Sequence, residues 1–260
     1  MKSGFVIDNL YNNGDAFFDI EKSKLKIQLI QCTTAAHNKL FRDTINKYHS
    51  YVKYKDSPTR NLRYLVYEGE SGNHVGAVGL SSATIAVACR DAFVGWNNEI
   101  KMKHLNEVAN NSRFCLIRDN ITIKNVASMC LRQLREVGAN DWESRYNDKL
   151  ILLETFVQPD RDSELDGHAT RNGSCYRSDN WIEVGMTSGA SIQKSPLVLW
   201  AKETGERGRL ARENKEECLR IYGKYLGEHN GSGYKVTESK KKIVFVKPLV
   251  HNWKRLLNHE

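Results

Sequence analysis

The alternation of apolar and polar residues along the chain predicts a mixed α/β fold from its first regular segment onwards. Residues 25–31 alternate between apolar and polar side chains, as expected for a half-buried strand. A helix with an apolar stripe is predicted from about residue 37 to residue 49, with Thr33 or Thr34 as its N-cap. The pattern thus begins with a strand followed by a helix.

A hairpin and a second helix are predicted next. Residues 61–68 and 74–80 flank a five-residue loop that contains glycine, which is typical of a β-hairpin. Residues 97–110 show apolar positions at helical spacing, so we expect a helix that ends at the Asn110–Asn111 pair.

The remaining pattern centres on residues 111–187. Apolar runs at 113–117 and 150–157 indicate strands, and residues 125–137 between them have the spacing of a helix. Strand, helix and strand with nearly continuous apolar strands predict a βαβ unit whose parallel strands are buried. We expect these strands to diverge and leave a polar notch. A strand at 240–248 and a helix at 251–257 follow in the C-terminal part.

Length and composition fit one large domain, or a core with a smaller addition. We divide the 260 residues into an N-terminal extension (1–22), a core (23–189) and a C-terminal region (190–260) that supplies a last strand and helix to the core. No apolar run approaches the roughly 20 residues that span a bilayer, and the N-terminus lacks a signal-peptide pattern. We therefore expect a cytoplasmic protein without membrane contact.

The six cysteines are scattered and form no CxxC pair. This arrangement predicts reduced cysteines in the core and no disulfide framework. Neither the cysteines nor the histidines have zinc-ligand spacing, so we expect no metal site.

The net charge of +8 is unevenly distributed. Residues 190–260 contain 15 Lys or Arg and 8 Asp or Glu, so this basic region carries most of the excess. Such a surface indicates an acidic partner such as nucleic acid, or it is simply solvated.

Glu154 is a candidate for chemistry because it interrupts an apolar strand. Leucines before it disfavour the charged form of its carboxyl group. It is therefore a candidate general base or a site for a basic group. The structural alternatives are an ion pair with Arg113 or Arg177, or a position facing solvent at a strand edge.

Several basic and aromatic residues are candidates for contact with nucleic acid. Arginines near the strands and the lysines before the last strand are suited to phosphate, and tryptophans are suited to stacking on bases. The set comprises Arg90, Arg113, Trp96, Trp181, Lys240, Lys241 and Lys242. An internal salt-bridge network, core packing and a solvated strand leader are the corresponding structural alternatives.

The order of expected elements is similar to that of the acetyltransferase (GNAT) fold. Motifs at 90–96, 111–114, 125–128, 141–142, 153–157 and 173–181 together resemble the DruA family of the Druantia anti-phage system. Mom-type DNA-modifying enzymes show a looser resemblance in the segment 173–181. These resemblances imply an α/β protein with a GNAT-like core and a basic C-terminal extension.

The GNAT resemblance also implies roles for particular residues. Tyr176 lies where acetyltransferases place a tyrosine that protonates a departing thiolate, and a phenol can supply such a proton. Backbone amides before the helix at 125 would hold the pyrophosphate of acetyl-CoA. The corresponding positions are Thr122, Asn125, Ala127 and Ser128. Thr122 is not basic and Asn125 is not glycine, so this turn departs from the acetyltransferase pattern.

Two classes of function follow. The first is an anti-phage protein of DruA type that recognises or modifies DNA in a GNAT-like cleft beside Asn125, Glu154 and Tyr176. The second is a non-catalytic module that binds nucleic acid or other proteins of a defence complex. A small-molecule N-acyltransferase is a third reading. The sequence does not decide whether the protein is an enzyme.

Overall fold

The computed structural model describes residues 9–12, 15–18, 26–49, 54–55, 59–159, 172–192, 236–238 and 240–259. The chain forms two compact units, Met1–Gly185 with Ile243–Glu260, and Met186–Lys242. In the second unit β9 (Ala190–Ile192) pairs antiparallel with β10 (Val236–Glu238). The apolar run at 197–200 and the helix expected at 205–225 lie outside the described residues.

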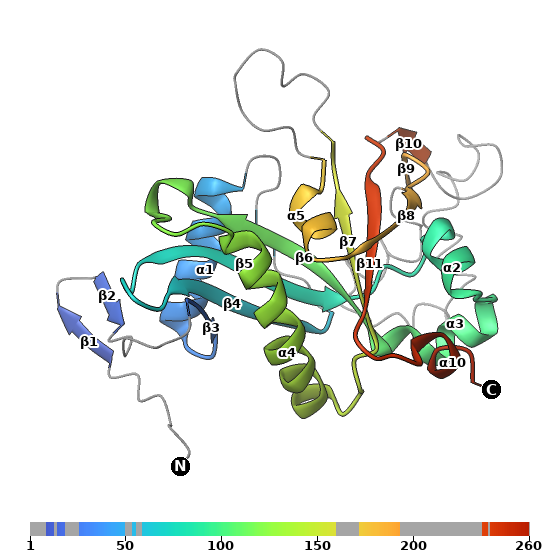
Figure 1. The fold of residues 1–260 in the computed structure, drawn as a ribbon, viewed down its shortest axis with the longest axis horizontal. Coiled ribbons are helices and arrows are strands. Elements are labelled where there is room, and N and C mark those ends of the chain that lie inside the picture. Colours follow the sequence, from blue (N-terminus) through green and yellow to red (C-terminus); the bar gives the residue numbers. More distant parts are fainter. Residues whose placement is uncertain are drawn as a thin grey trace, which may run out of the picture. The chain divides into compact units, whose positions relative to one another are not determined.

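A seven-stranded mixed sheet dominates the first unit (Figure 1). Its strand order is β3–β4–β5–β6–β7–β11–β8. The β6–β7 pair is parallel, whereas β3–β4, β4–β5, β5–β6 and β7–β11 are antiparallel. The strands are β3 (Ile27–Gln31), β4 (Asn61–Glu68), β5 (His74–Ser82), β6 (Val108–Leu116), β7 (Leu152–Val157), β8 (Ile182–Met186) and β11 (Ile243–Pro248). This topology bears out the expected α/β class with a mixed sheet.

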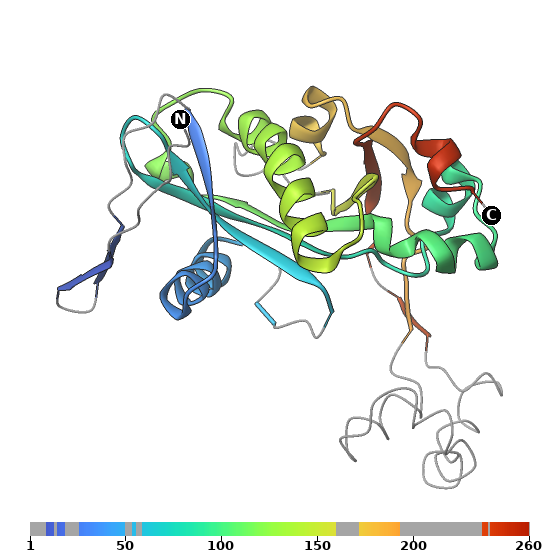
Figure 2. The same ribbon diagram turned by 90° about the horizontal axis from the view of Figure 1, so that it is seen from below.

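Helices cover both faces of this sheet. The helices α1 (Ala35–Tyr48) and α4 (Val126–Tyr146) lie on opposite faces (Figure 2). The shorter helices are α2 (Ala88–Val94), α3 (Asn98–His104), α5 (Ser174–Ser178) and α10 (Trp253–Leu256), with 3₁₀ turns η1 (Leu105–Glu107) and η2 (Arg118–Asn120). Side chains of α4 pack on Tyr64, Val66 and Leu80, whereas those of α1 pack on Leu65 and Tyr67. This alternation along β4 and β5 is the reason that both strands are apolar almost throughout.

Local sequence signals account for several of these elements. Thr34 is the N-cap of α1, and its hydroxyl accepts a hydrogen bond from the His37 N–H. The hairpin of β4 and β5 forms around the predicted glycine-bearing loop. Near the N-terminus, β1 (Asn9–Asn12) and β2 (Asp15–Phe18) pair so that Asn12 faces Asp15.

The helix predicted for residues 97–110 is wrong in its second half. Asn97 caps α3 by accepting from the Ile100 N–H, but α3 ends at His104. After a single 3₁₀ turn the chain enters β6 at Val108, several residues earlier than expected. Val108 and Ala109 are fully buried in the central sheet, and their apolar character fits the periodicity of a helix as well as that of a strand.

Within the part of the chain that the structure describes, no helix combines the length and the apolar character needed to cross a bilayer.

Candidate functional site

The parallel strands β6 and β7 are paired at only three positions. Val108 faces Leu152, Ala109 faces Leu153, and Asn110 faces Glu154. Beyond this point β6 continues beside β5, and β7 continues beside β11 (Figure 1). The strands therefore diverge, as expected for the βαβ unit.

Tyr176 of α5 fills the position where the strands diverge. Its hydroxyl lies 3.3 Å from Asn111 Nδ2 and 3.4 Å from Thr155 Oγ1, one residue beyond the last paired position on each strand. Its ring stacks on Phe245 at a centroid distance of 5.7 Å and meets Trp181 edge-on at 5.0 Å. Tyr176 is only 5% exposed. The expected notch is thus closed by a packed aromatic side chain.

Glu154 belongs to a different cluster, built from α2 and the loop before it. Arg90 Nη1 donates to Glu154 Oε2 at 2.5 Å, and the Thr84 N–H donates to Glu154 Oε1 at 2.7 Å. Arg90 also donates to Asp91 Oδ1 and to the Thr84 carbonyl, and Lys101 donates to Asp91 Oδ2. Burial raises the pKa of Glu154, against the opposing effects of the Arg90 guanidinium and the Thr84 amide.

These contacts place Glu154 and Tyr176 on opposite faces of β7. Thr155, the neighbour of Glu154, is the residue that reaches Tyr176, and successive side chains of a strand point to opposite faces. The packing agrees, because Leu153 shares a core cluster with Tyr176 and Leu152 shares another with Trp96. The expectation that one notch holds both groups is therefore wrong. The sequence motifs gave no information on side-chain direction.

Three of the residues predicted to contact nucleic acid are buried. Arg90 is 0% exposed, and its guanidinium lies 5.2 Å from the ring centroid of Trp96. The indole N–H of Trp96 donates to the Leu257 carbonyl, and that of Trp181 donates to Asp179. Contact between these side chains and a nucleic acid does not fit this burial, because every one of them is used in packing.

Packing and ion-pair contacts hold the segment 173–181 in place and explain its glycine and its aspartate. Gly173 has φ +80°, and a Cβ there would lie 2.5 Å from the Phe245 ring. Asp179 pairs with Arg135 of α4, and Lys247 of β11 donates to the Asp179 carbonyl. This segment therefore serves to seat α5, and with it Tyr176, over the diverging strands.

The turn before α4 contains a carboxylate of its own. Glu68, at the end of β4, accepts hydrogen bonds from the Thr122 N–H (2.7 Å), Thr122 Oγ1 (2.6 Å), the Ile123 N–H (3.3 Å) and Ser71 Oγ (2.9 Å). It is 1% exposed. Burial favours a higher pKa, but the hydrogen bonds from Thr122, Ser71 and Ile123 together lower the pKa of Glu68 below 4.5.

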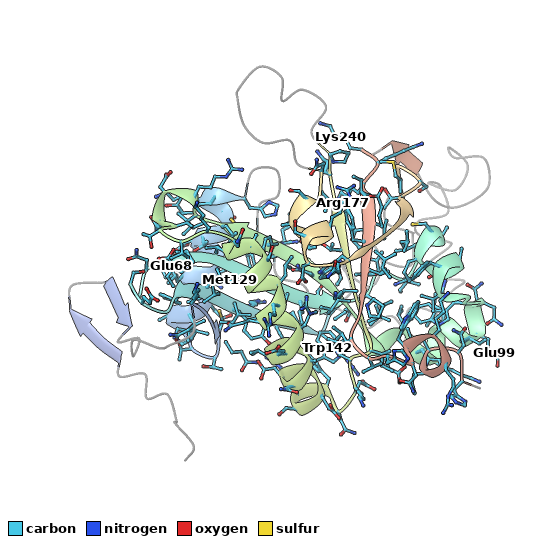
Figure 3. All side chains as sticks on the ribbon, in the orientation of Figure 1. Glu68, Glu99, Met129, Trp142, Arg177 and Lys240 are labelled. Carbon is cyan, nitrogen blue, oxygen red and sulfur yellow. The ribbon has the colours of Figure 1, made fainter. Side chains whose placement is uncertain are left out.

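A pocket of about 600 Å³ opens beside this turn. Figure 3 shows Glu68 and Met129, which both line it, at the same end of the sheet. Lys26, Lys124, Glu70 and Asn125 also contribute. Asn125 has φ 62° and makes no side-chain capping bond to α4, and Ala127 and Ser128 are half-buried in the first helical turn. Among the described lining residues, two lysines and two glutamates give no net charge.

A second, shallow depression of about 40 Å³ lies on the face of the sheet that α1 covers in part. Its cationic side chains are Lys55, Arg63 and Arg113, and the described residues that line it include neither Asp nor Glu. We call this depression the basic groove. Its further polar lining residues include Tyr54, Asn61, Ser81 and Ser112.

Arg113 uses only part of its hydrogen-bonding capacity on the described residues. Its Nη1 donates to the Ser112 carbonyl at 2.6 Å, but its buried Nε has no acceptor among the described residues. Arg63, in contrast, donates to Asn38 Oδ1 and lies 5.5 Å from the ring centroid of Tyr54. A buried guanidinium N–H without an acceptor is rare, because leaving it unpaired costs free energy.

The three lysines before β11 belong to the second unit. Lys240 and Lys241 are exposed, and Lys242 is half-buried. The Lys242 backbone exchanges hydrogen bonds with Thr187, donating to its hydroxyl and accepting from its N–H. Figure 3 labels Lys240.

Fold and contacts together define a mixed α/β protein in which an α5 aromatic group closes the gap between two diverging parallel strands. The chain belongs to the family described as Druantia protein DruA, which matches residues 11–259. This membership gives the chain a role in anti-phage defence. A comparison with curated proteins found no match.

The sequence did not predict Glu68 as a site residue, nor the two cations that share the basic groove with Arg113. Glu68 follows an apolar strand and precedes a glycine-bearing loop, a context common to many solvent-exposed glutamates. Lys55 and Arg63 lie about 50 or more residues from Arg113 along the chain, so only the sheet brings them together.

Proposed function

We propose that this DruA-family chain acts in anti-phage defence by binding the phosphate backbone of DNA, and that the basic groove is a contact surface for it. The clustering of Lys55, Arg63 and Arg113 in the basic groove carries this proposal. Arg113 is half-buried, and an arginine binds phosphate through several N–H groups at once.

Charge in the basic groove supports the same ligand. Three cations line the groove, and no Asp or Glu stands among its described lining residues. Together they create a local positive potential that attracts a polyanion and releases its counterions. The groove is shallow, and the Tyr54 ring is covered by Arg63 and meets Phe41 edge-on at 5.9 Å. These features favour contact with phosphates over stacking on a base.

Lys240 and Lys241 form a second, separate candidate contact. Both are exposed, and neither forms an ion pair with another residue that the structure describes. Other proteins of the defence system are further candidate partners, as expected for a component of a multi-protein system.

Chemistry on the nucleic acid has less support. The order of strands and helices in the first unit agrees with a GNAT-like core, and this order supports acyl transfer as the alternative. Glu154 and Tyr176 lie on opposite faces of β7, so the two groups cannot act on the same atom of a substrate. This arrangement is evidence against acyl transfer. We therefore favour binding without catalysis.

The binding proposal is tested by fluorescence anisotropy with a short duplex DNA at several salt concentrations. Arg113→Gln should weaken binding to all sequences alike and lower the slope of log K against log salt by about 1. Arg118→Gln is the matched control, because Arg118 is an exposed cation outside the basic groove. Equal effects of the two substitutions, or no binding by the wild type, would overturn the proposal.

The lysines are tested in the same assay. Lys240→Gln with Lys241→Gln should lower the salt slope independently of Arg113→Gln, because the two contacts involve separate charges. An unchanged slope would remove these lysines from the contact surface without affecting the role of Arg113.

A further inference from the structure

The turn before α4 is where a GNAT-like core would hold the pyrophosphate of coenzyme A, and the residues present do not fit that group. A pyrophosphate at such a turn is bound by backbone N–H groups that point toward it. Here the Thr122 and Ile123 N–H groups already donate to Glu68.

We propose that Glu68 is an internal ligand of this turn, and that its carboxylate occupies the amide groups that an external anion would need. All four hydrogen bonds to Glu68 come from groups in two loops, the β4–β5 loop and the turn before α4. The carboxylate thereby joins these loops and excludes a pyrophosphate from the same amides. This inference is independent of the nucleic-acid contact in the basic groove.

Geometry distinguishes Glu68 from an ordinary surface glutamate. Each carboxylate oxygen accepts two bonds, Oε1 from Thr122 N–H and Ile123 N–H, and Oε2 from Thr122 Oγ1 and Ser71 Oγ. Its acceptor capacity is filled from within the protein. Charge-assisted bonds to a carboxylate are about twice as strong as neutral ones, so an incoming anion would first have to displace four such bonds.

The charge of the neighbouring pocket also disfavours the binding of pyrophosphate. Lys26 and Lys124 are opposed there by Glu68 and Glu70, so the described lining of the pocket offers no excess positive charge to a diphosphate. A bound diphosphate would also lie beside the Glu68 carboxylate and be repelled by it. Removal of Glu68 would leave both lysines, one carboxylate and two unoccupied amide groups.

The experiment measures the melting temperature of the full chain with increasing inorganic pyrophosphate, and separately with acetyl-CoA. Wild-type protein should show no shift at millimolar ligand. Glu68→Ala should melt at a lower temperature without ligand, and its melting temperature should rise with pyrophosphate, because a ligand that binds only the folded state stabilises it.

Glu70→Ala is the matched control. It removes the same charge from the same pocket but leaves the Thr122 and Ile123 amides bonded to Glu68. A pyrophosphate response in Glu68→Ala but not in Glu70→Ala supports the inference. A response in the wild type that Glu68→Ala leaves unchanged overturns it, and so does a folded Glu68→Ala protein that does not respond.

Hydrogen exchange provides a second measurement if Glu68→Ala does not fold. In the wild type, the Thr122 and Ile123 amides should exchange more slowly than those of exposed loop residues such as Glu70 and Ser71. Glu68→Gln keeps the size of the side chain and weakens its bonds, so it should accelerate exchange at both amides. Unprotected Thr122 and Ile123 amides in the wild type would refute the role of Glu68.

Discussion

Arg90 and Glu154 form an ion pair in which neither side chain is exposed. The pair connects α2 to the centre of the sheet across 64 positions of sequence. Asp91 and the Thr84 backbone provide acceptors for the remaining guanidinium bonds, so the charges are compensated within the protein. A compensated buried pair contributes little net stability, but the loss of one partner is costly.

Arg90→Met is therefore expected to destabilise the protein by about 3–5 kcal/mol, because it leaves the Glu154 carboxylate buried without its counterion. Urea denaturation measures this loss. Arg90→Met combined with Glu154→Leu should regain part of it, because apolar side chains then replace both charges. A loss below about 1 kcal/mol for Arg90→Met alone would show that solvent reaches the carboxylate.

Tyr176→Phe is expected to cost only about 0.5–1.5 kcal/mol, because it removes two long hydrogen bonds and keeps the ring between Phe245 and Trp181. Tyr176→Ala should cost about 3–5 kcal/mol through the cavity that it creates. Thermal or urea unfolding provides both values.

The same Tyr176→Phe variant separates a structural role from a chemical one. We expect it to retain DNA binding and protection of cells against phage. Loss of protection without loss of stability or DNA binding would assign a chemical role to the phenol, as the resemblance to acetyltransferases implies.

Local signals in the sequence predicted most of the elements around these residues. The Thr34 cap, the glycine-bearing hairpin loop and the continuous apolar run of β7 each depend on a few neighbouring residues. The boundary between α3 and β6 was not predictable in this way, since Val108 and Ala109 are buried in a strand although their spacing also suits a helix. Partners across the sheet decide that choice, and they lie far away in the sequence.

The candidate site was less predictable for a similar reason. The sequence indicated that Glu154 and Tyr176 lie near the diverging strands, but a one-residue difference along β7 decides which face each contacts. The partner of Glu154 is Arg90, and neither of the arginines expected to pair with it does so. Glu68 had no local signal, because three of its four hydrogen bonds come from Thr122 and Ile123, more than 50 positions later.

Gly173→Ala is predicted to destabilise the protein more than Gly72→Ala. Both glycines have positive φ, +80° and +72°, so each alanine costs about 1–2 kcal/mol in backbone strain. At position 72 nothing lies within 4 Å of an added Cβ, whereas at position 173 the Phe245 ring lies at 2.5 Å. The clash should add about 1–3 kcal/mol. Equal losses in urea unfolding would contradict the close packing of α5 on β11.

The contribution of Glu68 to stability is predicted to disappear in acid. Its pKa in the folded protein lies below 4.5, so the unfolded chain binds the proton first as the pH falls. The stabilisation is therefore fully present above the unfolded pKa and is lost as the pH falls through the folded pKa. Glu68→Gln does not titrate at this position. The difference in unfolding free energy between wild type and Glu68→Gln should stay constant near neutral pH and shrink below about pH 4.5. A difference that grows on acidification would contradict the hydrogen bonds assigned to Glu68.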